Sequence, residues 1–309
     1  MRVLALLLLL AACTPDFAAP SDVTDLRVLA VQAEPPEARF DPDAGVAEPV
    51  KVDVLAVDPS RDAGPQSIQL QICGPTDSRR CDEGPVIDAG TVPLSFTLPS
   101  VDATALLAND DLAGFGGIRV QLSFTVDDGS PKGPVHGDKV IIYSSALPPC
   151  PPDAGIAPSR NRNPALTGVL LTVAGQDAGA FAPDASLTVG TEYGLRPVLA
   201  DGGEEDYCTV DLRGEVLQLR EQAHYAFFTA PGGEFDSDTA DEPLDGGAPP
   251  DGLTRFTPHA DAGTIWIVVR DGRGGESWLE RSWTASPDAG VSPTRPSSGR
   301  GGRARPGPR

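Results

Sequence analysis

The chain has 309 residues and carries 44 acidic against 24 basic side chains, a formal net charge of −20 at neutral pH. This acidity excludes nucleic acid and anionic lipid head groups as favoured partners, since both repel a negative surface. Proline and glycine number 32 and 34, together about a fifth of the residues against a usual share of about 12%, which indicates many short elements joined by turns.

The first residues have the pattern of a secretory signal peptide. Arg2 gives a positive start, residues 3–10 are mostly leucine, and Leu10-Ala11-Ala12 come directly before Cys13. The apolar run is shorter than the roughly 20 residues of a membrane-spanning helix. A cysteine after Leu-Ala-Ala resembles the lipobox of bacterial lipoproteins. That resemblance implies removal of residues 1–12, lipid on the Cys13 thiol and an acyl chain such as palmitate on its new amino group. A plain signal peptide that happens to contain a cysteine is the alternative.

Residues 13–24 are then the tether between lipid and fold, and residues 25–147 are predicted to be a first all-β domain. Short apolar runs with period-two alternation, separated by Gly, Pro and Asp clusters, indicate strands. Only residues 102–112 have the pattern of a short helix. The predicted strands are Asp25–Gln32, Val50–Val57, Ser67–Ile72, Leu94–Leu98, Ile118–Val126 and Lys139–Tyr143.

A proline-rich stretch, Leu147-Pro148-Pro149-Cys150-Pro151-Pro152, predicts a stiff linker and a domain boundary. Residues 148–285 continue with alternating runs and show no sustained helical periodicity. Asp271–Gly275 is a predicted hairpin loop. The fold class is therefore all-β, with two Ig-like antiparallel sandwiches in tandem. The strands expected in the second domain are Ala165–Ala174, Tyr193–Leu199, Val216–Arg220, His224–Thr229, Thr264–Arg270 and Ser277–Trp283.

Two compositional features accompany these domains. Residues 286–309 consist mainly of Pro, Gly, Ser and Arg, a composition typical of a disordered basic tail. Asp-Ala-Gly recurs seven times at irregular spacing, so it does not mark a repeat fold. Aspartate as a side-chain cap and glycine at positive φ suit turns, and we expect these copies to fill turns between strands.

Four cysteines remain besides Cys13, and an even number in an exported protein favours disulfides. Cys73 and Cys81 bracket a short polar loop, so local pairing is natural and leaves Cys150 with Cys208. Three pairings are formally possible. A metal site is disfavoured, because no CxxC or CxxH spacing occurs and no histidine lies near these cysteines.

Three stretches carry a resemblance to a known group: Leu26–Ala38 (LRVLAVQAEPPEA), Asn161–Gly168 (NRNPALTG) and Trp266–Gly275 (WIVVRDGRGG). With the Asp-Ala-Gly loops and the lipobox, they are similar to uncharacterised lipoproteins of myxobacteria. The last stretch is also similar to the final hairpin of bacterial Ig-like and PKD-like extracellular modules. The resemblance covers most of residues 25–285. It implies tandem Ig-like sandwiches exposed on the cell envelope, and it carries over no catalytic residue.

Signatures of catalysis are missing from the sequence. His136, His224 and His259 have no histidine or cysteine at ligand spacing, and no hydrolase, nucleotide-binding or zinc-protease motif occurs. The acidic stretch at residues 234–242 raises one alternative, calcium binding. Its candidate ligands are Asp236, Asp238 and Asp241, near a second acidic group at residues 201–206. The stretch departs from the EF-hand pattern, so a solvated insertion is favoured.

We therefore expect a lipid-anchored cell-envelope protein that is not an enzyme and needs no cofactor. Thr14 replaces the aspartate that, in the best-known sorting rule, retains lipoproteins at the inner membrane, which favours the outer membrane. The expected role is a binding or structural module whose partner is an envelope protein or a glycan, besides the membrane that its lipid enters. An exported polysaccharide hydrolase using loop carboxylates and a calcium-binding adhesion module are the alternatives. The sequence does not define the oligomeric state.

Overall fold

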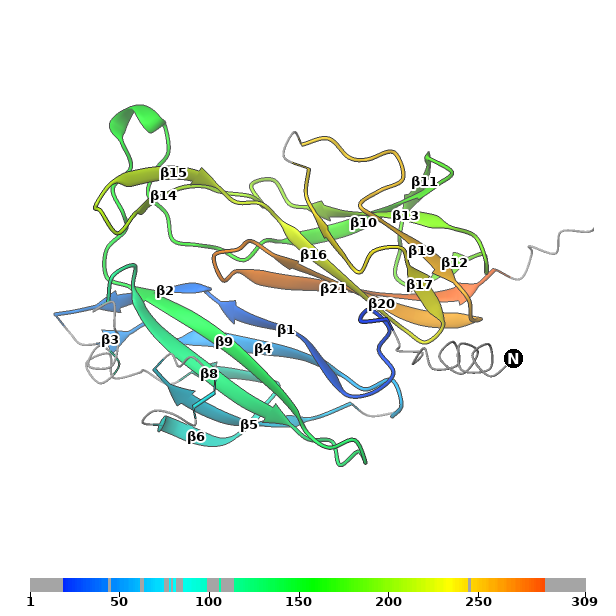
Figure 1. The fold of residues 1–309 in the computed structure, drawn as a ribbon, viewed down its shortest axis with the longest axis horizontal. Coiled ribbons are helices and arrows are strands. Elements are labelled where there is room, and N and C mark those ends of the chain that lie inside the picture. Colours follow the sequence, from blue (N-terminus) through cyan, green and yellow to red (C-terminus); the bar gives the residue numbers. More distant parts are fainter. Residues whose placement is uncertain are drawn as a thin grey trace, which may run out of the picture.

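A computed structural model gives the structure, which describes residues 19–43, 46–61, 64–74, 78, 80–81, 86–98, 106, 114–243 and 246–286. The predicted all-β class is confirmed: the elements among these residues are mainly antiparallel sheets, with two parallel pairings and one short 3₁₀ helix, η1 (Pro152–Ala154) (Figure 1). Within the described residues, no helix has the length and apolarity needed to cross a membrane. The helix expected at residues 102–112 lies outside the described residues except for Leu106.

The first sandwich packs a six-stranded sheet on a three-stranded sheet. Its single parallel pairing joins β2 to β9. The six-stranded sheet has the order β3 (Val46–Ala47), β2 (Glu37–Asp41), β9 (Val135–Ser144), β8 (Ile118–Val126), β5 (Ser67–Cys73), β6 (Val86–Pro93). The three-stranded sheet has the order β1 (Arg27–Glu34), β4 (Val50–Val57), β7 (Ser95–Leu98).

The core of the first sandwich is filled by apolar side chains that alternate with polar ones along its strands. Along β5, Ile68, Leu70 and Ile72 are buried while Gln69 and Gln71 face solvent, as side chains on successive strand residues must. Each such aliphatic side chain contributes about 1.5–3 kcal/mol by leaving water. They pack with buried residues of β4 and β8 in one continuous cluster.

The second sandwich joins two five-stranded sheets and carries a separate two-stranded hairpin. One sheet has the order β11 (Gln176–Ala180), β10 (Leu166–Val173), β13 (Tyr193–Leu199), β19 (Thr254–Pro258), β17 (Gly233–Phe235). The other has the order β12 (Ala185–Leu187), β21 (Glu276–Ala285), β20 (Ala262–Arg270), β16 (His224–Ala230), β18 (Thr239–Asp241). The hairpin consists of β14 (Asp206–Val210) and β15 (Val216–Arg220).

Aromatic rings bridge the two sheets of the second sandwich. Phe227 lies 5.7 Å from Phe235, Phe235 5.0 Å from Phe256, and Phe256 6.0 Å from Trp283, measured between ring centroids. These tilted and edge-on arrangements are the favourable ones for aromatic pairs. The chain's few large rings are therefore concentrated where the second core needs volume.

Two described copies of Asp-Ala-Gly lie entirely within strands, so the interpretation as turn filler is wrong for them. Residues 88–90 lie within β6 and residues 177–179 within β11. Both strands are sheet edges, where small and polar residues cost little because one side of the strand faces solvent. In β11 the pairing with β10 shifts register beside Gly179, whose φ of 91° suits a bulge.

A third apolar cluster joins the two sandwiches. It brings Leu29 and Ala30 of β1 against Trp266 and Val268 of β20. The partly buried Trp278 of β21 packs beside them. Of the three tryptophans, Trp283 thus belongs to the second core and the other two belong to the domain boundary, which ties the domains into one body.

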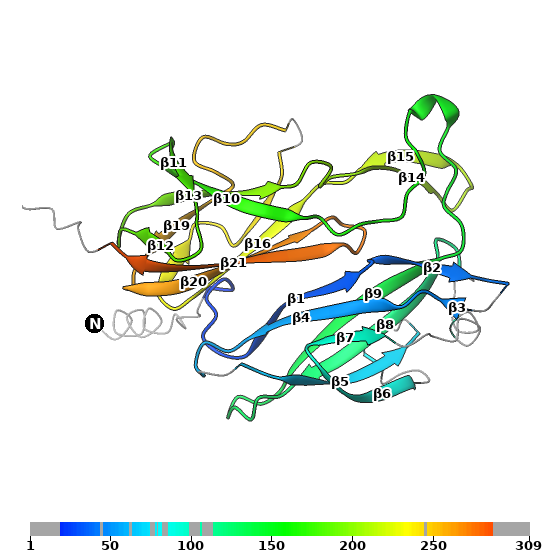
Figure 2. The same cartoon turned by 180° about the vertical axis from the view of Figure 1, so that it is seen from behind.

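The last residues of the expected tether belong to this body. Thr229 of β16 donates its amide to the Ser21 carbonyl at 2.8 Å, and its own carbonyl accepts the Val23 amide at 2.9 Å. Ser21 and Val23 are buried. The described N-terminal residues and the end of β21 therefore lie at one end of the molecule, opposite the β14–β15 hairpin (Figures 1 and 2). Residues 287–309 of the predicted tail lie outside the described residues.

Candidate functional site at the domain boundary

Side chains of the second domain cap the free edge of β1. The Glu276 carboxylate accepts the Val31 amide at 3.2 Å, and Arg270 donates to the Leu29 carbonyl at 3.2 Å. The Asn163 side-chain amide donates to the Ala33 carbonyl at 2.7 Å. Leu29, Val31 and Ala33 direct their backbone N–H and C=O groups away from β4. The side chains of the second domain therefore supply the hydrogen bonds that a neighbouring strand would otherwise make.

Glu276 is the charged centre of this capped edge. Its carboxylate lies 2.6 Å from Arg270 Nη2 and 3.2 Å from Lys139 Nζ, and Lys139 comes from β9 of the first domain. The Glu276 side chain is 6% exposed and that of Lys139 is 11% exposed. A carboxylate this deeply buried needs both its cations and its amide donor, so the three groups depend on one another.

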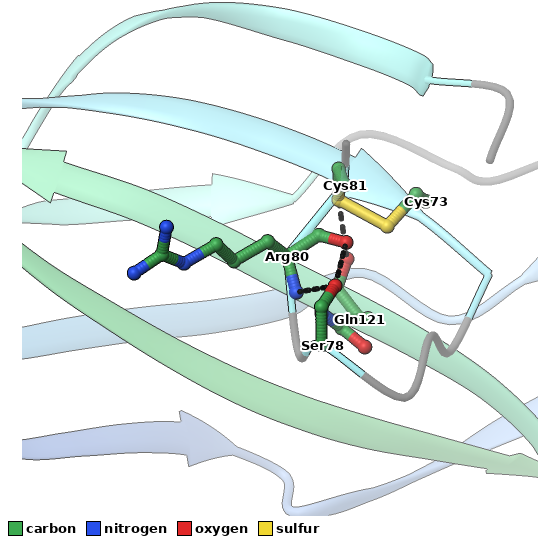
Figure 3. Close-up of a disulfide and its surroundings, with 5 residues drawn as sticks. All are labelled: Cys73, Ser78, Arg80, Cys81 and Gln121. Carbon is green, nitrogen blue, oxygen red and sulfur yellow. Dashed lines mark hydrogen bonds between the residues drawn. A yellow bond between two sulfur atoms is a disulfide. The ribbon is translucent and has the colours of Figure 1, made fainter. Parts of the chain in front are cut away.

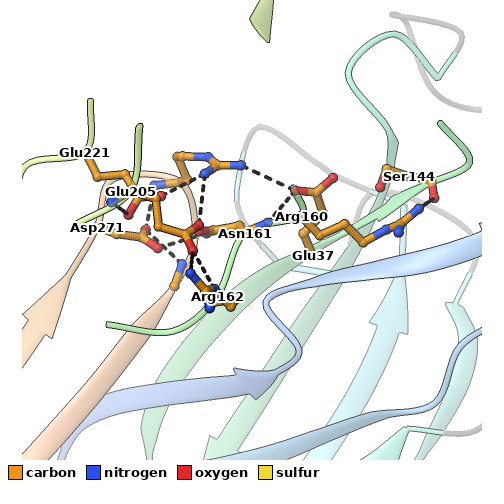
Figure 4. Close-up of polar contacts among 10 residues, drawn as sticks. Glu37, Ser144, Arg160, Asn161, Arg162, Glu205, Glu221 and Asp271 are labelled. Carbon is orange, nitrogen blue, oxygen red and sulfur yellow. Dashed lines mark hydrogen bonds and ion pairs between the residues drawn. The ribbon is translucent and has the colours of Figure 1, made fainter. Parts of the chain in front are cut away.

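Arg273 forms a second ionic centre close by, with three glutamates that Figure 4 labels: Glu37, Glu205 and Glu221. Its Nη1 lies 2.8 Å from Glu221 Oε1 and 3.7 Å from Glu205 Oε2, and its Nη2 lies 3.5 Å from Glu37 Oε2 in the first domain. The guanidinium also lies 4.1 Å above the Tyr207 ring, a cation–π contact. One arginine therefore connects the hairpin, the β20–β21 loop and β2.

The surrounding carboxylates are already engaged. Glu205 also pairs with Arg162, and its amide donates to Glu221 Oε2 at 3.0 Å. Burial raises the pKa of the Glu221 carboxyl, and the charge of Asp271 adds to this rise, while the Glu205 amide and Arg273 oppose it. The arrangement therefore holds domains together, because each carboxylate already has a cation or an amide donor.

The loop that carries Arg273 explains one of the quoted sequence stretches. Asp271 Oδ1 accepts the amides of Arg273 at 2.7 Å and Gly275 at 2.9 Å, while its Oδ2 accepts the Asn161 side-chain amide at 2.8 Å. Gly274 has a φ of 105°, which favours glycine. At Gly275 a Cβ atom would lie 2.0 Å from Asp271 Oδ2. The turn thus requires Asp271, Gly274 and Gly275.

A groove of about 720 Å³ lies beside Arg273 at the domain boundary. We call it the interdomain groove. One wall is residues 207–210 of β14, and the other is formed by residues 114–118 and 142–148 of the first domain, with Glu37 and Arg273 also lining it. Phe115 in this lining is 40% exposed. The groove is thus mainly apolar, with one neutralised ionic centre.

The two disulfides have the pairing that the sequence predicts. Cys73–Cys81 joins the end of β5 to the following loop, where Cys81 lies against the Gln121 carbonyl of β8 (Figure 3). Cys150–Cys208 ties the proline-rich linker to β14, a wall of the groove. Cys13, the predicted lipidation site, lies outside the described residues.

The calcium candidates do not converge. Asp236 Oδ1 accepts the Thr254 hydroxyl at 2.9 Å and the Arg255 amide at 2.8 Å, and Asp241 Oδ1 lies 2.6 Å from His224 Nδ1. Asp238 contributes its backbone carbonyl to the Phe227 amide. In the part of the chain that the structure describes, no three Asp, Glu, His or Cys side chains are grouped to hold a metal ion.

The other residues considered from sequence are dispersed. His136 lies in β9 and contacts Thr125 of β8, and His259 contacts Glu234. In the second acidic group, Glu204 accepts the Ala223 amide and Glu205 joins the Arg273 centre. Nothing brings the three histidines together, since each is paired within its own region.

Sequence reasoning missed the residues that form the boundary: Glu37, Asn163, Arg273 and Glu276. The available signal was that the three stretches quoted for their resemblance contain or adjoin all of them. The structure brings these stretches together in space, which a list of positions along the chain does not reveal. The polar and charged residues of these stretches form contacts between the two domains.

The fold and this site define an all-β protein of two joined sandwiches with a groove at their boundary. No family model and no curated protein matches the chain. Among solved structures, it is similar to Parabacteroides merdae β-glucuronidase, at 9% identity and a TM-score of 0.21, covering 82% of this chain and 25% of that one.

Two further structures give comparable values. Dimeric latent PorU from Porphyromonas gingivalis has 11% identity and a TM-score of 0.22, covering 86% of this chain and 24% of that one. The serine-rich repeat protein Srr2 from Streptococcus agalactiae has 12% identity and a TM-score of 0.18, covering 92% and 99%. The chain spans about a quarter of the length of the glucuronidase and of PorU. These TM-scores support no functional argument.

Proposed function

We propose that this protein is a lipid-anchored module of the cell envelope, at the outer membrane, with a binding or structural role and no catalytic one. The observation that carries the proposal is the placement of its two ends. The described N-terminal residues are fixed to β16 toward one end of the molecule, while the β14–β15 hairpin lies toward the other (Figure 2). Residues 207–210 of that hairpin form one wall of the interdomain groove. An anchor at Cys13 then presents the groove away from the bilayer.

Two features support this assignment. Two disulfides are typical of an exported chain, since thiols in the cytosol are kept reduced. The carboxylates nearest the groove are paired with arginines or amides, whereas a glycosidase needs two carboxyl groups facing a sugar as acid and as base or nucleophile. The second point favours binding over hydrolysis at this groove.

The test is protease treatment of intact and permeabilised cells that express the full chain or its Cys13→Ala variant. We expect the wild type in the outer-membrane fraction. We expect the Cys13→Ala variant, which cannot carry the lipid, in a soluble fraction. Digestion on intact cells favours a partner outside the cell, and digestion only after permeabilisation favours a partner in the periplasm. Recovery of the wild type in a soluble fraction, identical to Cys13→Ala, contradicts the proposed anchor.

A further inference from the structure

The hairpin formed by β14 and β15 leaves one strand edge unpaired within the groove. At one end of the hairpin Glu221 donates its amide to the Glu205 carbonyl, and at the other Asp211 donates its amide to the Glu215 carbonyl. Hydrogen-bonded pairs alternate with non-bonded pairs along an antiparallel ladder, so the odd-numbered residues of β14 and β15 form the hydrogen-bonded pairs. Cys208 and Val210 therefore direct their N–H and C=O groups away from β15. Those groups have no partner among the described residues.

Cys208 and Val210 both line the interdomain groove, together with Tyr207 and Thr209. When consecutive residues of a strand line a groove, its backbone edge faces the groove, because alternate side chains point to opposite faces. On the opposite wall, Phe115 is 40% exposed, and Leu147 and Pro148 also line the groove. The edge thus combines unpaired backbone groups with an apolar surrounding.

The groove continues the established boundary between the domains. At that boundary the free edge of β1 is capped by Arg270, Glu276 and Asn163. No side chain caps β14 among the described residues, although Arg273, which joins the domains, also lines the groove. The two charged side chains in the groove lining, Arg273 and Glu37, are opposite in sign and lie 3.5 Å apart, so the groove favours an uncharged occupant.

We infer that the interdomain groove binds an extended, uncharged segment of a partner protein, which adds to β14 as a third strand. Backbone N–H and C=O groups at strand spacing are complemented by another peptide backbone, and the apolar walls accept alternate apolar side chains. A glycan or an acyl chain lacks that regular pattern of donors and acceptors. The inference rests on the proposed binding role and specifies its partner class.

The experiment is a selection of phage-displayed random dodecapeptides on the immobilised full-length protein, with both disulfides formed. The matched variants are Val210→Pro and Val216→Pro, because these two residues lie opposite each other and both direct their N–H outward. Proline removes the N–H, and it is tolerated at an edge that faces solvent. Val210→Pro changes the groove edge, whereas Val216→Pro changes the far edge.

We expect enriched peptides with alternating apolar residues that bind the wild type and Val216→Pro, with at least tenfold weaker binding to Val210→Pro. Circular dichroism and mass spectrometry establish that each variant is folded and oxidised. Hydrogen exchange on the wild type gives a measurement that needs no variant: a bound peptide should protect the Cys208 and Val210 amides and leave Val216 and Gln218 unchanged.

Two results overturn the inference: no enriched peptide, or peptides that bind Val210→Pro as well as the wild type without protecting Cys208 and Val210. Neither result bears on the anchor, because cell fractionation tests that separately. A peptide binder found in a soluble, unanchored protein would leave this inference standing and remove the proposed location.

Discussion

Replacing Glu276 by alanine tests whether the capped edge of β1 holds the two domains together. The change removes the acceptor of the Val31 amide and the counter-charge of Lys139, whose side chain is 11% exposed. Leaving a buried charge without its partner costs about 3–5 kcal/mol. Arg270 is 45% exposed and regains water, so it adds little. We expect a loss of about 3 kcal/mol.

The assay is urea unfolding followed by tryptophan fluorescence, which reports the boundary through Trp266 and Trp278. With a slope of about 3 kcal/mol/M, the midpoint should fall by about 1 M. The control is Glu192→Ala, which breaks a 3.5 Å pair with Arg255 whose side chains are 59% and 44% exposed. That change should cost less than about 1 kcal/mol. Equal losses in the two variants would refute the reasoning.

Three further predictions concern the disulfides, the loop and alkaline pH. Chain entropy predicts that Cys150→Ser with Cys208→Ser, which opens a separation of 58 residues, costs about 4 kcal/mol. Cys73→Ser with Cys81→Ser, at a separation of 8, should cost about 2.5 kcal/mol, and urea midpoints in the reverse order would contradict this. Gly275→Ala should lower the free energy of unfolding by about 1–3 kcal/mol, because the new Cβ would collide with Asp271 Oδ2. The control is Gly214→Ala in the exposed β14–β15 turn, where a Cβ meets no neighbour and only the φ of 85° disfavours alanine. Burial raises the pKa of Tyr143 to about 12 from 10.0, so its hydroxyl stays protonated in the fold while the unfolded chain ionises. Stability should then fall between pH 10 and 12, and less steeply in Tyr143→Phe; identical slopes would exclude this cause.

Local pattern was enough to predict the strands that cross the cores. Residues 67–72 and 118–126 alternate so regularly that only a strand puts their apolar side chains on one face. The edge strands β6 and β11 were missed, since their Asp-Ala-Gly residues have the composition of turns. At a sheet edge, hydrogen bonding to one neighbour outweighs that local preference.

The candidate site could be predicted only in part. The hairpin loop around Arg273 was visible as a loop, and the acidic residues at 201–206 were visible as a charged group. Their meeting was not, because Glu205 and Arg273 are 68 positions apart in the sequence and are brought together only where the β14–β15 hairpin folds beside the β20–β21 loop of the same domain. The calcium hypothesis found no support in the opposite case. Asp236 and Asp241 are close along the chain, yet Asp236 bonds to β19 and Asp241 to β16, so their carboxylates do not converge.

The sequence by itself determined the all-β class and favoured the disulfide pairing that the structure shows, because side-chain alternation and cysteine spacing are local properties of the chain. It also motivates the export and anchoring hypotheses through the first thirteen residues. Only the tertiary structure decided that the sandwiches share an apolar boundary, that second-domain side chains cap β1, and that β14 keeps a free edge beside a groove. Those features depend on contacts between residues that are far apart in the sequence, which no local pattern encodes.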